Sequence, residues 1–244
     1  MLRRKFISGA ALSLCAPRAL AAGWRNEWTT AELVIWILLD GSGSMYSQRD
    51  EPFDGSIGKQ HYVTQRDGHV QAFLDESVQY ALLERNTVVH VLIWAGSTAV
   101  VREITPIGGL EIHSLEDSAL LAGILMERVP TSSLSNDSTS HFTGYDYILK
   151  SPQRPGAKVI IDIATDAGIL IPDQRKSMQV VRNKLLKMGV TSNVLAVDLE
   201  RNPIAFSSLE QHVSFGEKSF VHTASFGSYA EDIQDKLVRE ILAT

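Results

Sequence analysis

Residues 33–45 read LVIWILLDGSGSM, and this stretch decides the fold. Its first seven residues form an unbroken apolar run, which is the pattern of a β-strand buried on both faces. The loop DGSGS follows at once, as residues 40–44. In open α/β sheets, ligands bind at the carboxyl ends of the strands, directly after runs of this kind. The stretch therefore predicts a fold class and also the edge of the sheet where function should lie.

Apolar runs and helical patterns alternate along the rest of the chain. Further strands are predicted at residues 88–94, 99–104, 158–164, 193–197 and 218–222, and helices at residues 70–83, 115–126, 174–187, 207–213 and 229–242. The alternation predicts an α/β fold, a Rossmann-like doubly wound and mainly parallel sheet with helices on both faces. The short connection at residues 95–98 predicts one antiparallel edge strand.

The last predicted helix, residues 229–242, is amphipathic. Its apolar face consists of Tyr229, Ile233, Leu237 and Ile241, preceded by Phe226. Acidic residues stand near its start, and Lys236 and Arg239 stand nearer its end, which complements the helix dipole. We expect this helix to close the single core of the domain.

The first 22 residues, MLRRKFISGAALSLCAPRALAA, predict an export signal peptide. A basic start is followed by a short, mildly apolar stretch and by small residues that suit cleavage near Ala21/Ala22. The run RRKFI resembles a twin-arginine signal. We therefore expect residues 1–22 to be the signal, 23–30 a linker and 31–244 one domain, which is periplasmic or secreted after cleavage. An amphipathic N-terminal helix is the alternative.

The composition limits the partners that this domain can have. The 244 residues are 44% hydrophobic and 21% charged, as in ordinary globular proteins, and the formal net charge is −5. A negative chain is not expected to bind nucleic-acid phosphates. No run after residue 22 approaches the roughly 18 apolar residues of a membrane-spanning helix, so we expect no transmembrane segment in the mature chain.

The loop after the first strand carries oxygen ligands. Asp40, Ser42 and Ser44 alternate with glycines, which let the backbone turn tightly. One carboxylate and two hydroxyls suit Mg²⁺, Mn²⁺ or Ca²⁺ rather than Zn²⁺. The alternative for either serine is that it caps a following helix.

Residues 33–45 resemble the opening of a von Willebrand factor A (vWA) domain, in which an Asp-x-Ser-x-Ser loop begins a metal-ion-dependent adhesion site. That family adds a threonine from a second loop and an aspartate from a third. Thr139 in STSHFTGY, residues 138–145, matches the threonine, although Thr143 lies in the same loop. Asp166 in DIATDAG, residues 162–168, matches the aspartate, with a turn residue as the alternative.

The resemblance covers residues 31–242, nearly the whole predicted mature chain. More narrowly, the chain looks like a poorly characterised group of secreted bacterial proteins. The shared features are Gln65-Arg66-Asp67-Gly68, Trp94, Asn193 and the closing run KLVREI at residues 236–241.

The resemblance implies a metal site formed by Asp40, Ser42, Ser44, Thr139 and Asp166, most readily for Mg²⁺. In the family the serines usually bind the metal directly, and the carboxylates often act through water. The ion is then under-neutralised and attracts a carboxylate, so the expected partner is a protein that donates an Asp or Glu.

Two other functions stay open at this point. The domain could serve as a scaffold that assembles through another surface, with a purely structural metal. It could also be a metal-dependent hydrolase, but the histidines form no zinc motif and no nucleophile elbow occurs, so we do not expect an enzyme.

Three features beside the expected site also allow two interpretations. His141 could approach the metal. Asp162 is either a hydrogen-bonded structural residue or a support for Asp166, because an unpaired charge inside an apolar strand is unfavourable. The polar segment Tyr46–His61 is either a lid beside the metal or a plain surface loop.

Overall fold

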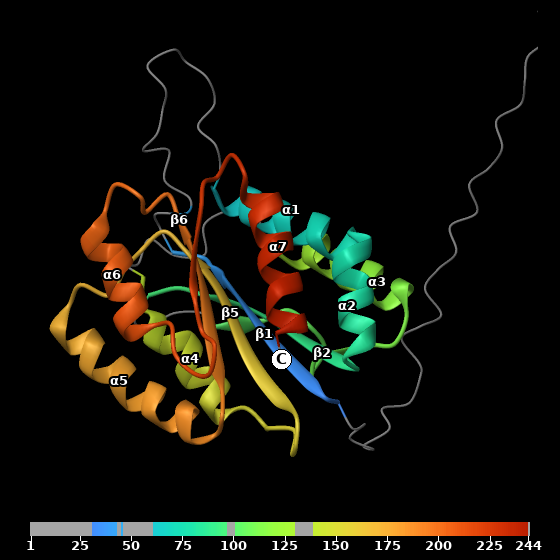
Figure 1. Ribbon diagram of the computed structural model, residues 1–244, viewed down its shortest axis with the longest axis horizontal. Coiled ribbons are helices and arrows are strands. Elements are labelled where there is room, and N and C mark those ends of the chain that lie inside the picture. The colour runs from blue at the N-terminus through green and yellow to red at the C-terminus, as the bar shows by residue number, and fades with distance from the viewer. Residues whose placement is uncertain (1–30, 43–44, 46–60, 97–100, 130–138, 244) are drawn as a thin grey trace, which may run out of the picture.

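The computed structural model describes residues 31–42, 45, 61–96, 101–129 and 139–243 (Figure 1). The strands are β1 (Leu33–Asp40), β2 (Thr87–Trp94), β3 (Arg102–Glu103), β4 (Leu110–Ile112), β5 (Lys158–Thr165), β6 (Thr191–Val197) and β7 (Val221–Ala224). The helices are α1 (His61–Leu74), α2 (Glu76–Glu84), α3 (Leu115–Arg128), α4 (His141–Lys150), α5 (Pro172–Lys187), α6 (Pro203–His212) and α7 (Tyr229–Leu242). The predicted signal and linker, residues 1–30, lie outside the described residues.

The strands form one mainly parallel sheet. Its order is β3-β2-β1-β5-β6-β7, and β4 also pairs with β2. β1 runs parallel to β2 and β5, whereas β3 and β4 run antiparallel to β2 along its outer edge. Every residue of β1 and β2 is buried, which is why both strands are mainly apolar, although His90 interrupts the run in β2. The predicted doubly wound α/β fold with an antiparallel edge is confirmed.

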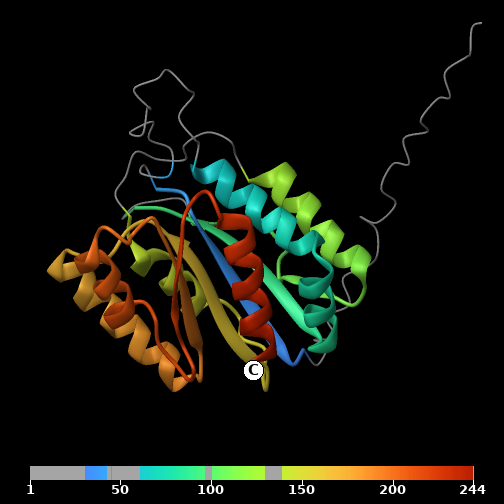
Figure 2. The same cartoon turned by 45° about the horizontal axis from the view of Figure 1, so that its top comes forward.

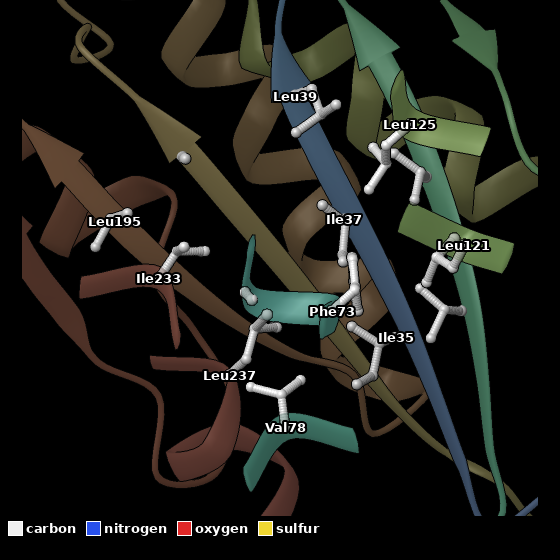
Figure 3. Packing of buried hydrophobic residues seen from close by; sticks show 14 of the residues in the cluster. Ile35, Ile37, Leu39, Phe73, Val78, Leu121, Leu125, Leu195, Ile233 and Leu237 are labelled. Carbon is white, nitrogen blue, oxygen red and sulfur yellow. The ribbon is translucent and has the colours of Figure 1, made fainter. Parts of the chain in front are cut away.

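Helices cover both faces of the sheet (Figure 2). α1, α2, α3 and α7 pack on one face, where Ile35 and Ile37 of β1 meet Phe73 and Leu237 (Figure 3). α4, α5 and α6 pack on the other face, toward which Trp36 points. None of the helices in the described ranges combines the length and the apolar character that crossing a membrane requires. The central position of β1 fixes where its last residue, Asp40, lies.

The helix predicted over residues 70–83 is in fact two helices, α1 and α2. Asp75 separates them in an extended conformation, and its carboxylate accepts hydrogen bonds from the backbone N–H groups of Ser77 and Val78. This capping starts a new helix at Glu76. α1 begins at His61 rather than at residue 70. Its buried residues include polar side chains such as Gln65, which obscured the apolar period in the sequence.

Other boundaries differ by a few residues. The strand predicted at 218–222 is β7, residues 221–224, because Lys218 has a positive φ of 56° and cannot continue an extended strand. Within the strand predicted at 99–104, β3 comprises only residues 102–103, and residues 97–100 lie outside the described part of the chain. α6 starts at Pro203, where Asn202 accepts a hydrogen bond from the Ala205 N–H.

Candidate metal centre

Asp40 is fully buried at the carboxyl end of β1, and its side chain is held from two sides. The Ser42 N–H donates to Asp40 Oδ1 over 2.9 Å, and the Thr165 hydroxyl donates to Oδ2 over 2.7 Å. The backbone of Asp40 is fixed as well. The Gln65 side-chain amide accepts a hydrogen bond from the Asp40 N–H and donates one to its carbonyl, both at 3.1 Å. Asp40 is therefore positioned before any ligand arrives.

Asp166 lies beside Asp40 because β1 and β5 are parallel neighbours. Leu39 pairs with Ala164, so Thr165 comes level with Asp40 and the half-buried Asp166 follows it at the sheet edge. Burial, together with the negative charge of Asp166, raises the pKa of Asp40 to about 7, although hydrogen bonds from Ser42 and Thr165 oppose the shift. The structure thus places Asp40, Ser42 and Asp166 at one edge of the sheet, and the charges of the two aspartates interact.

The first turn of α4 reaches the same edge. The Gly41 N–H and the Thr143 hydroxyl both contact the end of β2, through the carbonyls of Trp94 and Ala95 at 2.7 and 3.3 Å. The Thr143 hydroxyl also donates to the carbonyl of Ser140 over 2.8 Å, and this hydrogen bond lies in the first turn of α4. Thr139 is half-buried, two residues ahead of α4.

His141 lies near this edge, whereas Asp162 lies in the middle of β5. His141 is buried with its ring centroid 5.1 Å from that of Trp94, and burial lowers its pKa to about 3, so the ring is neutral. Asp162 faces the opposite helical layer. Its Oδ1 lies 2.6 Å from the Nζ of Lys236, and both side chains are fully buried. Asp162 is therefore the structural residue that the sequence suggested as one of two interpretations.

Some predicted features fall outside the described residues, namely Ser44 and residues 46–60 of the segment Tyr46–His61, while His61 itself begins α1. Within the described ranges, no group of three or more His, Cys, Asp or Glu side chains comes together in a way that could hold a metal ion. The candidate centre differs from such groups, because it has only two carboxylates and its other proposed ligands are hydroxyl groups.

Sequence reasoning missed two residues that position this centre. Thr165 stands directly before Asp166, and its hydroxyl reaches Asp40 only because β1 and β5 are in register. Gln65 was noted as part of a shared run and not as the residue that fixes the Asp40 backbone. The signal in the sequence was the pair Gln65 and Gly68, which lie on the same buried face of α1. Gly68 lets α7 pack against this face, because a Cβ at residue 68 would lie 2.4 Å from Tyr229 Cδ1.

Comparisons with known proteins agree with this architecture. Residues 53–244 match the family described as "Protein of unknown function (DUF1194)". No curated protein matches the chain.

Several solved structures share the fold. BatB from Bacteroides thetaiotaomicron is similar with a TM-score of 0.54 at 13% identity, covering 87% of this chain and 100% of that one. The vWF domain of the type V pili tip protein Mfa5 from Porphyromonas gingivalis gives a TM-score of 0.55 at 9% identity, covering 87% and 96%. The pilus adhesin SpaC from Lactobacillus rhamnosus GG gives 0.56 at 12% identity, covering 87% of this chain and 30% of the adhesin. At these identities the likeness establishes the fold.

Proposed function

The chain belongs to the DUF1194 family and has a vWA-like fold, and on that basis we propose that it is an exported protein that binds a protein partner through a divalent cation. The cation, most readily Mg²⁺, would be held by Asp40, Ser42, Ser44, Thr139 and Asp166. An Asp or Glu carboxylate of the partner would complete its shell.

The observation that carries this proposal is that the carboxylates of Asp40 and Asp166 follow neighbouring strands at the end of the sheet, near enough for the charge of Asp166 to act on Asp40. Burial and the charge of Asp166 make ionisation of Asp40 unfavourable, as its pKa of about 7 indicates. A divalent cation between the two would reverse this effect, because each carboxylate then faces a positive charge. The Asp40 side chain is already oriented by Ser42 and Thr165, so little order has to be created on binding.

The donor set also explains why such a cation would attract a partner. Two carboxylates and three neutral hydroxyls would provide five hard oxygen donors, one fewer than the six of an octahedral Mg²⁺ shell, which leaves a position for an oxygen of a partner. Hydroxyls are weak donors, so a further carboxylate from a partner is strongly favoured in a partly desolvated site. The pilus adhesin and the pilus tip protein among the similar structures support a binding role rather than catalysis.

We assign the threonine ligand to Thr139, as the resemblance implies, with Thr143 as the alternative. Thr139 is half-buried and lies two residues ahead of α4. The Thr143 hydroxyl contacts the carbonyls of Ala95 and Ser140 in the first turn of α4.

Titration calorimetry of the full chain with MgCl₂ and MnCl₂ tests the proposal. We expect saturable binding by the wild type and its loss in Asp166→Asn. Asp198→Asn is a matched control, because Asp198 is an exposed aspartate that follows β6 at the same sheet edge. Its φ of 51° is one that asparagine tolerates. Absence of binding by the wild type, or equal binding by Asp166→Asn, contradicts the proposal.

A second pair of variants tests the choice of threonine. Thr139→Val should weaken cation binding, whereas Thr143→Val should retain it, since valine keeps the shape of threonine and removes only the hydroxyl. The opposite pattern would assign the site to Thr143.

Export is tested separately by cell fractionation. Replacing Arg3 and Arg4 by lysine should retain the protein in the cytoplasm if residues 1–22 act as a twin-arginine signal. Unchanged export of this variant contradicts that route.

A further inference from the structure

A cavity lies beside the amino-terminal half of β1, on the face covered by α4. Its volume is about 320 Å³, at the lower end of the range for small-molecule sites. The strand residues that line it, Val34 and Trp36, belong to the amino-terminal half of β1, whereas Asp40 ends the strand. The cavity is therefore separate from the candidate metal centre.

A break in strand pairing creates this cavity. The outer edge of β2 is paired with β4 up to Val89 and with β3 from Leu92 onward. His90 lies opposite the connection between these two short strands. Ile107 and Gly108 of that connection form part of the cavity wall.

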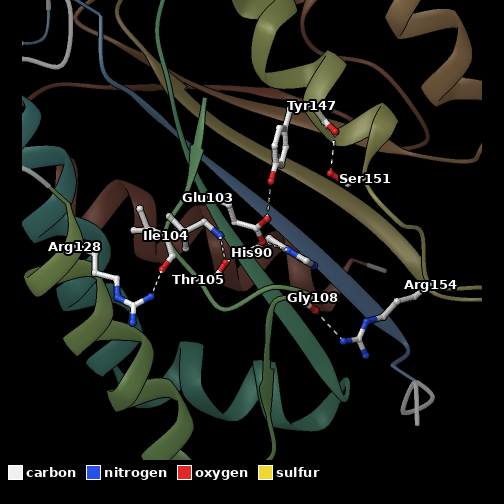
Figure 4. A network of polar contacts seen from close by, with 10 residues as sticks. His90, Glu103, Ile104, Thr105, Gly108, Arg128, Tyr147, Ser151 and Arg154 are labelled. Atoms are coloured by element: carbon white, nitrogen blue, oxygen red, sulfur yellow. Dashed lines mark hydrogen bonds and ion pairs between the residues drawn. The ribbon is translucent and has the colours of Figure 1, made fainter. Parts of the chain in front are cut away.

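The ring of His90 is oriented by Glu103 (Figure 4). Nδ1 lies 2.6 Å from Glu103 Oε1, and the same carboxylate accepts hydrogen bonds from the hydroxyls of Thr105 and Tyr147 at 3.2 and 3.0 Å. Glu103 thus acts as an acceptor throughout, and Nδ1 of His90 must carry the hydrogen. Nε2, the other ring nitrogen, has no such partner in the described part of the chain and can accept a hydrogen bond from a hydroxyl group.

Nothing in the described residues supplies a donor to that acceptor. His90 is only 6% exposed and lines the cavity, and its one hydrogen bond to a described residue is the one from Nδ1. Gly109 packs closely against the ring, since a Cβ there would lie 2.7 Å from Nε2. A ring nitrogen that borders a cavity can accept a hydrogen bond from a ligand or from a water molecule.

The walls of the cavity favour an aromatic, uncharged ligand. The Trp36 ring stacks on His90 at 3.8 Å between centroids, and Tyr147 meets Trp36 edge-on at 6.2 Å. The charges around the cavity are already paired, because Glu103 has three donors and Arg154 lies 2.8 Å from Glu111. Burial and the contact with Glu103 raise the pKa of Tyr147 to about 12, so it remains a neutral donor. A charged ligand would find no opposite charge to compensate it.

We propose that this cavity is a binding site for a small, uncharged aromatic molecule that carries a hydroxyl group. The ring lies among Trp36, Tyr147 and Ile107, and the hydroxyl donates its hydrogen to Nε2 of His90. The site is independent of the cation and of the protein partner proposed above.

Two probes test this site on the full chain, one with a hydrogen-bond donor and one in which a methyl group replaces the donor's hydrogen. 4-Methylphenol can donate a hydrogen bond, and 4-methylanisole, its methyl ether, cannot. Dissociation constants would be measured by NMR titration of the labelled protein. We expect 4-methylphenol to bind about tenfold more tightly, the effect of one buried hydrogen bond.

Variants connect that preference to His90. His90→Asn keeps an N–H close to Glu103 but removes Nε2, so the preference should disappear. His222→Asn, at the opposite edge of the sheet in β7, should keep it. Ile107→Asp should weaken both probes, and because Ile107 is 90% exposed this variant leaves the fold intact. No saturable binding of 4-methylphenol, equal binding of the two probes, or a preference that survives in His90→Asn overturns the proposal.

Discussion

Asp40 and Asp162 are fully buried aspartates on neighbouring strands of one sheet, and the protein compensates their charges in different ways. Asp162 lies in the middle of β5, and Lys236 of α7 reaches it over 2.6 Å while also contacting Glu240. Asp40 ends β1 and receives only neutral donors, from Ser42 and Thr165. Among the described residues, no cationic side chain contributes to the pKa of Asp40.

Asp162 has a permanent charge pair with Lys236, whereas the proposed cation at Asp40 could be bound and released. An ammonium group built into a helix compensates Asp162 whenever the protein is folded, so that region serves stability. Although burial opposes ionisation of Lys236, Asp162 and Glu240 hold its pKa above the ordinary value. At Asp40 the compensating cation of the proposed site would come from solution.

Breaking the permanent pair should give the largest effect on folding. Lys236→Met leaves Asp162 buried without its cation, and we expect the free energy of unfolding to fall by about 3–5 kcal/mol. Urea denaturation followed by circular dichroism measures this. Lys176→Met, on the exposed surface of α5, is the control and should leave stability unchanged. A loss as small as that of the control would mean that the buried pair contributes little.

Cation binding should stabilise the fold, and this effect should depend on Asp40. At a free Mg²⁺ concentration about 100 times the dissociation constant, the wild type should gain about 2.7 kcal/mol, or roughly 5–10 °C in Tm. Asp40→Asn should show no such gain, since asparagine provides one neutral oxygen in place of the carboxylate. Thermal unfolding with and without MgCl₂ measures both. Equal gains in the two proteins would place the binding of Mg²⁺ elsewhere.

Gln65 should affect both stability and cation affinity, to a smaller extent. Gln65→Leu removes two hydrogen bonds to the Asp40 backbone, and we expect a loss of about 2 kcal/mol in stability and about tenfold in cation affinity. Gln79→Leu is the matched control, because Gln79 is also buried and bonds a backbone carbonyl, that of Phe73, away from β1. If the control lowers cation affinity equally, Gln65 has no special role in positioning Asp40.

The sequence was sufficient to predict the elements that depend on apolar patterns and on the motif DGSGS. β1 and α7 lie where the apolar run and the helical period place them, and Asp40, the first residue of DGSGS, ends β1 at the carboxyl edge of the sheet. These signals are local, since each is contained within a few consecutive residues.

Long-range polar contacts were beyond such reasoning. Lys236 was interpreted as a complement to the helix dipole, yet it is buried with Glu240, because α7 crosses β5 at Asp162. His90 lies inside an apolar run, and only the register of β3 and β4 shows that it borders a cavity. In both cases the partner comes from a distant segment, and no pattern in either segment alone indicates it.

The protonation of Glu240 provides the most sensitive test of the permanent pair. Burial and the charge of Asp162 raise the pKa of Glu240 well above its ordinary value of 4.5, while Lys236 opposes this shift. The folded protein therefore holds this proton more tightly than the unfolded chain. The resulting stability is fully present below about pH 4.5 and is lost as the pH rises toward the folded-state pKa.

Glu240→Gln removes this dependence, because glutamine resembles the protonated acid. The wild type should lose stability relative to the variant by up to about 1.4 kcal/mol per pH unit above pH 4.5. His69 of α1 also acts on Asp162 and Lys236, but it is present in both proteins and cancels in the difference. Urea denaturation across pH 5–8 measures the trend, with the exposed Glu127→Gln as control. A constant difference across this range would show that Glu240 is ionised in the fold and that Lys236 compensates two charges.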